Sequence, residues 1–76
     1  MNDMLTMMED SAPSLKEAQQ IVGGYVEMQT LPNGDQLLID EDGGMKGLTK
    51  NHQASFLLGM VVVGPALLLR GDARWE

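Results

Sequence analysis

The stretch Val22-Gly23-Gly24-Tyr25-Val26-Glu27 most constrains how this chain folds, because it joins the first helical pattern to the first strand pattern. Two consecutive glycines adopt a positive φ without a side-chain penalty, so the chain can leave a helix and enter a strand within a few residues. We expect Gly24 to take such a positive φ. The hinge therefore predicts a helix that packs against the sheet following it.

The helix before the hinge is predicted over residues 15–22. A capping box, Ser14-x-x-Glu17, lets each side chain bond the other residue's backbone N–H at the start of the helix. Apolar side chains at i, i+3 and i+7 then form one stripe along it. This pattern is typical of a short amphipathic helix lying on a core.

A β-hairpin is predicted after the hinge. Residues 25–31 and 36–40 alternate as two strands. The Asn33-Gly34 pair between them supplies the positive φ angles of a tight turn. This hairpin is the best-defined local prediction in the chain.

The rest of the chain adds a second helix and a last strand. Thr49 or Asn51 caps a helix over residues 52–58, whose apolar side is Ala54, Leu57 and Leu58. Residues 60–69 are apolar but broken at Gly64-Pro65, and residues 45–48 are predicted to be extended. Residues 4–8 form either a short strand or a helical turn.

Together these elements predict one α+β domain over residues 1–76. The expected order is (β)-α-β-β-α-β, with an antiparallel sheet and both helices on one face. Residues 1–13 form an N-terminal segment and residues 70–76 a polar tail that contains Trp75, which we expect to fold back on the sheet or to pack on a neighbouring chain.

The short length of the chain predicts a thin core. A domain of about this size buries only about 60% of its unfolded surface, and 76 residues without cysteine have no disulfide to support them. Oligomerisation is the remaining source of stability, so we expect a homo-oligomer with residues 61–69 close to its interface. The absence of cysteine also fits a cytoplasmic location.

The net charge of −6 argues against general nucleic-acid binding, since an acidic chain repels phosphate at long range. No apolar run reaches the length of a membrane span, and the N-terminus lacks the basic region of a signal peptide. We therefore expect neither a nucleic acid nor a membrane as a partner.

The sequence predicts no catalytic residue, metal ligand or cofactor, and we expect no enzyme. His52 precedes Ser55 by three residues, but no acid is placed to orient a triad. The acidic turn Asp40-Glu41-Asp42 lacks the ligand spacing of a calcium loop, and a solvated turn explains it.

A candidate ligand site combines Gly23, Gly24 and Tyr25 with Lys50 and Asn51. Free N–H groups at the start of the second helix attract an anion, Lys50 adds positive charge, and the Tyr25 ring offers a stacking surface for a nucleobase. Residue by residue, ordinary roles remain open: Asn51 as a plain cap, Tyr25 as core and Lys50 as surface.

The order of four motifs resembles a family of small phage, plasmid and bacterial proteins known only as a domain of unknown function. The motifs are V-G-G-Y-V-E, D-E-D-G, K-G-L-x-x-N-x-x-A-S and V-x-G-x-x-L-L, spread over residues 15–69. Asp40, where the family commonly has Asn, and an extra Gly44 depart from the pattern.

This resemblance implies an accessory protein of a mobile element that acts against host defence, in the host cytoplasm if a phage encodes it. The leading hypothesis is a non-enzymatic sponge, a homo-oligomer that sequesters a nucleotide-like immune signal. The alternative is an acidic inhibitor or mimic that blocks a host defence protein.

Overall fold

The computed structural model describes residues 4–76, and its architecture follows from the last strand, β4 (Ala66–Leu69). All four β4 side chains are buried. A strand that is apolar on both sides needs cover on both sides, which places it inside a sheet with a layer on each face. The α+β class and the predicted order of elements are confirmed.

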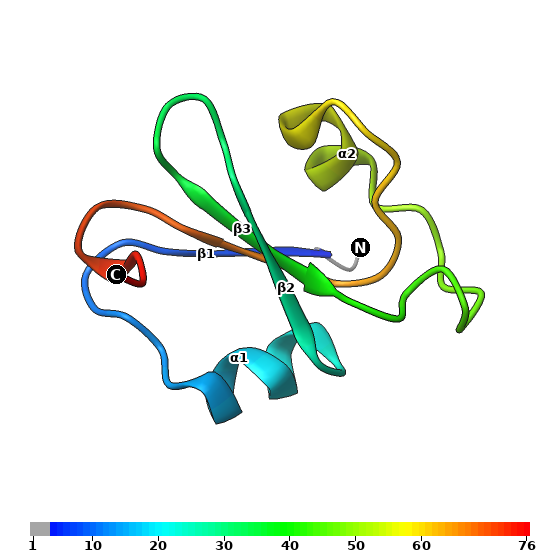
Figure 1. Cartoon of the computed structure of the whole chain (residues 1–76), viewed down its shortest axis with the longest axis horizontal. Helices are drawn as coiled ribbons and strands as arrows, with labels where there is room; N and C mark the ends of the chain where they lie inside the picture. The colour runs from blue at the N-terminus through cyan, green and yellow to red at the C-terminus, as the bar shows by residue number, and fades with distance from the viewer. Residues whose placement is uncertain (1–3) are drawn as a thin grey trace.

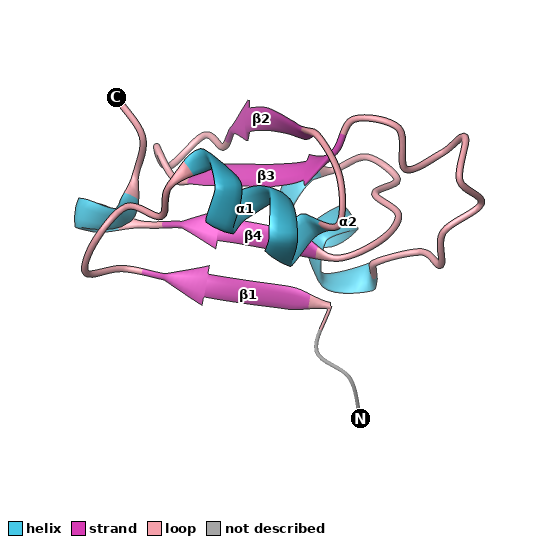
Figure 2. Cartoon of the chain, turned by 90° about the horizontal axis from the view of Figure 1, so that it is seen from below, coloured by secondary structure: helices cyan, strands magenta, loops and turns pink. Residues whose placement is uncertain are grey.

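The sheet has the order β1 (Leu5–Met8), β4, β3 (Gln36–Asp40) and β2 (Val26–Thr30). β4 pairs antiparallel with β3 and parallel with β1, as Figure 2 shows. The prediction of a purely antiparallel sheet is therefore wrong. β1 and β4 stand at opposite ends of the chain, and everything between them serves as the long crossover that a parallel pair requires.

The two helices cover opposite faces of the sheet (Figure 1), which corrects the prediction that both lie on one face. Helix α1 (Leu15–Val22) packs on the face that presents Leu38, Leu67 and Leu69. Helix α2 (His52–Leu58) packs on the face that presents Leu37, Ala66 and Leu68. The two faces need separate covers because consecutive leucines of β4 point to opposite sides.

The local signals at α1 are confirmed. Ser14 Oγ accepts from the Glu17 N–H at 3.1 Å, and Glu17 Oε1 accepts from the Ser14 N–H at 2.9 Å. Gly23 ends the helix at φ 90°, and its N–H bonds the Gln19 carbonyl. The positive φ expected of Gly24 thus belongs to Gly23, because the left-handed residue is the one directly after the last helical turn.

The β2–β3 hairpin is confirmed, with a different turn. Only Gly34 takes a positive φ, at 92°. Asn33 instead uses its side chain: Oδ1 accepts from the Asp35 N–H at 3.0 Å. The turn is stabilised by an Asn side chain bonding the backbone two residues on, a common role of this residue type.

The remaining segments differ from the predictions in their local shape. Residues 41–47 form turns, so residues 45–48 do not form an extended piece, and residues 60–63 contribute only an isolated bridge between Lys50 and Val63. The polar tail contains a short 3-10 helix (Gly71–Ala73). Trp75 folds back, its Nε1–H donating to the Pro13 carbonyl at 2.9 Å.

The apolar segment 61–69 does not need a second chain to cover it throughout. β4 lies inside the sheet and is buried by the chain's own helices. Val61, by contrast, is 74% exposed. The exposure argument for an interface therefore does not apply to β4, because a central strand is covered on both faces, while the homo-oligomer itself stays a prediction.

Candidate functional site

The five residues of the predicted ligand site lie in two separate places. Gly24 and Tyr25 line a hollow of about 320 Å³ together with Gln19, Asp42 and Lys46. Lys50 lines another hollow, of about 400 Å³, with His52, Ser55, Phe56, Gly59, Met60 and Val61. No residue is common to the two hollows, so the structure does not bring the Tyr25 ring together with Lys50.

The glycines of the hinge have a structural role. A Cβ on Gly24 would lie 2.6 Å from Lys46 Nζ and 2.9 Å from Asp40 Oδ2. Lys46 Nζ itself contacts Asp40 Oδ2 at 2.6 Å and the Gly23 carbonyl at 3.3 Å. Gly24 therefore leaves room for an ion pair that ties residues 41–47 to the hinge, which we call the Lys46 latch.

Asp40 is held in its charged form by this latch. Its side chain is 1% exposed. The hydrogen bond from Lys46 lowers the pKa of Asp40 below its ordinary value; burial opposes this shift, while the Asp42 N–H and the positive charge of Lys46 support it. A buried carboxylate with these partners is a structural group and leaves no free oxygen pair for a ligand.

Asn51 is also committed to the fold. Its side chain is buried, and its Oδ1 accepts from the Ala54 N–H at 3.0 Å as the cap of α2. Its Nδ2 donates to the carbonyls of Met4 and Gly64, at 2.9 and 3.0 Å. The prediction of Asn51 as the cap is confirmed, and its side-chain oxygen and nitrogen are both bonded within the fold.

The hydroxyl of Ser55, three residues after His52, is bonded to the loop that follows α2. Ser55 Oγ accepts from the Val62 N–H at 2.8 Å and lies 3.2 Å from the Val62 carbonyl, to which it donates. Its hydroxyl therefore joins α2 to the loop after it. Among the residues that the structure describes, no cluster of three or more potential metal ligands is found.

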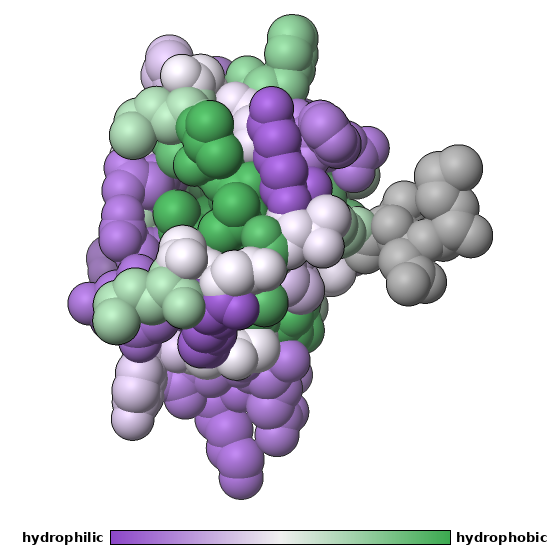
Figure 3. Space-filling model, turned by 90° about the vertical axis from the view of Figure 1, so that its right-hand side faces the viewer, coloured by the Kyte–Doolittle hydropathy of each residue, from purple (hydrophilic) through white to green (hydrophobic). Residues whose placement is uncertain are grey.

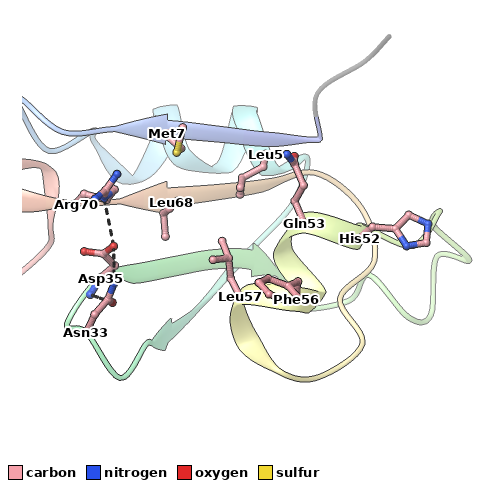
Figure 4. A pocket seen from close by; sticks show the side chains of 10 residues that line it. All are labelled: Leu5, Met7, Asn33, Asp35, His52, Gln53, Phe56, Leu57, Leu68 and Arg70. Carbon is pink, nitrogen blue, oxygen red and sulfur yellow. Dashed lines mark hydrogen bonds and ion pairs between the residues drawn. The ribbon is translucent and has the colours of Figure 1, made fainter.

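A hollow larger than these two lies elsewhere, on the α2 side of the sheet. This groove of about 630 Å³ lies between α2 and the β2–β3 turn, and it opens toward the edge strand β1 (Figure 4). Its apolar lining comes from three elements, namely β1, β4 and α2, through Leu5, Met7, Leu68, Phe56 and Leu57. A mostly apolar concave surface with a few polar groups is the usual form of a binding site.

The polar end of the groove is fixed by an ion pair. Arg70 Nε lies 3.3 Å from Asp35 Oδ2, and Arg70 Nη1 lies 3.4 Å from Glu9 Oε1. Asn33 lies beside Asp35 and donates to it at 3.2 Å. These contacts hold the turn against the end of β4 and give the groove one polar wall (Figure 4).

Phe56 lines both this groove and the hollow that Lys50 lines. Both hollows include His52 and Phe56. The Phe56 side chain is 87% exposed, and Met7, Met60 and Val61 beside the hollows are 58%, 66% and 74% exposed. We call the two hollows and these side chains the α2 surface. Seen from the right-hand side of Figure 1, the molecule presents a group of apolar side chains bordered by polar ones (Figure 3).

The sequence carried a signal for Phe56 that the prediction did not use. The buried side of α2 contains Ala54. Phe56 follows Ala54 by two positions, which is roughly 200° around a helix of 3.6 residues per turn. A large aromatic residue on the outward side of a short amphipathic helix indicates contact with something other than the helix's own core.

Comparison of the chain with protein-family models, with curated proteins and with solved structures found no match. The family resemblance of the four motifs therefore stays a prediction. No helix within residues 4–76 is long and apolar enough to cross a membrane.

Proposed function

We propose that this chain is a non-enzymatic protein-binding module that works through the α2 surface. The observation that carries the proposal is Phe56, the only phenylalanine of the chain, which is 87% exposed between two hollows. A buried aromatic side chain removes roughly 150–250 Å² of surface from water. The exposed Phe56 ring can bury an area of this order against a partner protein.

The composition of the α2 surface is that of a protein interface. Its centre is apolar, and polar side chains stand around it: Asn33, Asp35, Lys50, His52, Gln53 and Arg70. Protein interfaces commonly combine an apolar centre rich in aromatic residues and Met with a polar rim. The exposed Met7 and Met60 add pliable thioethers that adapt to different shapes.

The charge of the α2 surface also favours a protein partner. Its charged linings are Asp35, Lys50 and Arg70, which sum to +1, whereas the whole chain carries −6. The acidic residues therefore lie mostly away from this surface. A partner with an apolar segment can approach without desolvating many carboxylates, whose burial costs several kcal/mol each.

This proposal is a form of the protein-inhibitor hypothesis, moved from an acidic face to an apolar one. The nucleotide-sponge hypothesis draws less support from the geometry, because Tyr25 and Lys50 line different hollows that share no residue. If the chain is an accessory protein of a mobile element, as the resemblance implies, the partner is a host protein.

The test is panning of a random peptide library against the immobilised chain, followed by fluorescence anisotropy with the selected peptides. We expect peptides with several apolar residues and a Kd of about 1–100 μM, equivalent to roughly −8 to −5 kcal/mol. Phe56→Ser should weaken binding at least tenfold. Tyr25→Ser, which removes a 68% exposed aromatic from another part of the surface, is the matched control and should leave binding unchanged.

Calorimetry with a panel of nucleotides decides between this proposal and the sponge hypothesis. Nucleotide binding that Tyr25→Ser abolishes, combined with peptide binding that ignores Phe56→Ser, would overturn the protein-binding proposal. Peptide binding that depends on Phe56 without any nucleotide binding would support it.

A further inference from the structure

The outer edge of β1 is open. β1 stands at the end of the sheet, and within residues 4–76 its only strand neighbour is β4. The carbonyls of Met4 and Met8 accept from the N–H groups of Ala66 and Arg70, at 2.7 and 2.9 Å. Because backbone groups alternate in direction along a strand, Leu5 and Met7 direct their N–H and C=O groups away from β4, to the open edge.

Apart from its short length of four residues, this edge lacks the features by which proteins commonly prevent strand pairing. Its four residues, Leu5–Met8, include no charge and no proline, and their pairing with β4 runs without a bulge. The other edge strand, β2, carries an exposed charge, Glu27, bonded to Gln29. Uncharged open edges favour pairing with another strand.

We propose that β1 pairs antiparallel with β1 of a second copy of this chain, with Thr6 on the two-fold axis. In this register Leu5 of each copy lies opposite Met7 of the other. These are the two residues whose backbone groups face the open edge, so each pair exchanges both of its main-chain hydrogen bonds. If the axis passed through Leu5, Met7 would have no partner within β1 of the other copy. If it passed through Met7, Leu5 would have none.

The side chains that meet in this register are compatible on both faces of the sheet. Leu5 and Met7 point to the α2 side, where they line the groove. Thr6 is exposed and points to the opposite side, where two threonines face each other. Apolar pairs and Thr–Thr pairs directly across two strands are favourable, and no charge meets its own kind within β1.

Such a dimer changes the groove. Figure 4 shows Gln53 beside Leu5, at the β1 side of the groove. The second copy brings its own Leu5, Met7 and Gln53 to this side, and the two grooves then share one apolar floor on an eight-stranded sheet made from two four-stranded ones. The pairing does not depend on the proposed function, whereas the role of the shared floor in binding does.

The expected dimer is weak. Stable interfaces bury about 800 Å² per partner, which is about a sixth of this chain's surface of 5012 Å². A strand of four residues with a few flanking side chains buries less than that. Interfaces at this low end are commonly transient, so we expect a Kd of tens to hundreds of micromolar.

Cross-linking tests the register directly, because the chain has no cysteine of its own. Facing residues of a pair without main-chain bonds have Cα atoms about 4.5 Å apart, within the roughly 4.4–6.8 Å that a disulfide spans. Oxidised glutathione should convert Thr6→Cys to a covalent dimer much faster than Thr30→Cys, the same change on the exposed surface of β2. Equal rates for the two variants would overturn the proposal.

Sedimentation of the unlabelled chain provides the second test. The wild type should shift from a monomer of 8.3 kDa toward twice that mass as its concentration rises. Thr6→Lys should raise the dimer Kd at least tenfold through repulsion across the axis, while Thr30→Lys leaves it unchanged; circular dichroism confirms folding of both. A wild type that stays monomeric at about 1 mM would refute the dimer, because this concentration is higher than the highest Kd expected for it.

Peptide binding separates the two proposals. The Thr6 side chain lies on the face opposite the groove, so monomeric Thr6→Lys should still bind the selected peptides in a Phe56-dependent manner. Loss of dimerisation with retained peptide binding would show that the α2 surface binds peptides without the dimer. Dimerisation of the wild type without any peptide binding would support the β1 pairing and contradict the proposed function.

Discussion

The two faces of the sheet differ in how completely they are covered. On the α1 face, the buried cluster Ala18, Val22, Leu38, Leu67, Leu69 and Ala73 has exposed fractions of 0 or 1%. On the α2 face, Leu31 and Leu68 are 6% and 5% exposed, and a groove of about 630 Å³ is open to solvent beside Leu68. The closed face provides the well-packed core, and the open face provides a surface for binding.

The difference arises from the covers. Helix α1 contacts β2, β3 and β4. Trp75 packs on the same cluster and donates a hydrogen bond to the carbonyl of Pro13, just before the start of α1. Helix α2 has seven residues and places mainly Ala54 and Leu58 on its cluster. A cover this small leaves the space between α2 and the β2–β3 turn unfilled. The α1 face of the sheet thus contributes more to stability than the α2 face.

Neighbouring leucines of β4 offer the sharpest way to break this comparison. Leu67 lies in the closed cluster and Leu68 forms part of the groove. Leu67→Ala leaves a closed cavity and should lower the free energy of unfolding by about 3–5 kcal/mol. Leu68→Ala widens a groove that is already open, so it should lose mainly the transfer free energy, about 2 kcal/mol.

Urea denaturation of both variants measures this difference. The comparison fails if Leu68→Ala costs as much as Leu67→Ala, since the α2 face would then be as tightly packed as the α1 face. Slopes with denaturant that equal the wild-type slope would show that the shifts in midpoint report changes in stability.

The Lys46 latch gives a pH-dependent contribution to stability. The pKa of Asp40 is lower in the folded chain than in the unfolded chain, chiefly because Lys46 donates a hydrogen bond to it. The resulting stabilisation is present above the unfolded pKa of about 3.9 and is lost as the pH falls through the lower, folded pKa. Lys46→Met should therefore cost about 1–2 kcal/mol at pH 7 and progressively less below pH about 4.

Thermal denaturation between pH 7 and pH 2 measures the effect, which corresponds to about 4–8 °C per kcal/mol in a chain of this size. Lys16→Met, which removes the same charge from an exposed position on α1, is the control and should change little. A Lys46→Met deficit that stays constant down to pH 2 would show that the latch acts through packing and not through the Asp40 charge.

The sequence predicted those parts of the fold that depend on near neighbours. Ser14 and Glu17 set the start of α1, Asn51 sets the start of α2, and Asn33-Gly34 sets the hairpin, because each signal acts within about four residues. The class and order of elements follow from these local signals.

The sequence did not predict what depends on distant parts of the chain. Five residues at Met4–Met8 are too few for periodicity to separate a strand from a helical turn, and their strand forms only by pairing with β4 some sixty positions later. The same limit explains why the ligand hypothesis grouped Tyr25 with Lys50. Tyr25 and Lys50 lie in the first and third of the four motifs, and the structure places them at two hollows that share no residue.

The smallest stability effect is expected at the most exposed part of the α2 surface. Phe56 is 87% exposed, so Phe56→Ser removes little buried area and should change the free energy of unfolding by no more than about 0.5 kcal/mol. Serine also lowers the helix propensity of a seven-residue helix only slightly relative to phenylalanine. A residue kept for packing would behave like Leu67; a residue kept for binding should be nearly silent in denaturation and decisive in peptide binding. Measuring both quantities on this one variant separates the two roles, and a loss of 2 kcal/mol or more would assign Phe56 to the core of the α2 face instead of its binding surface.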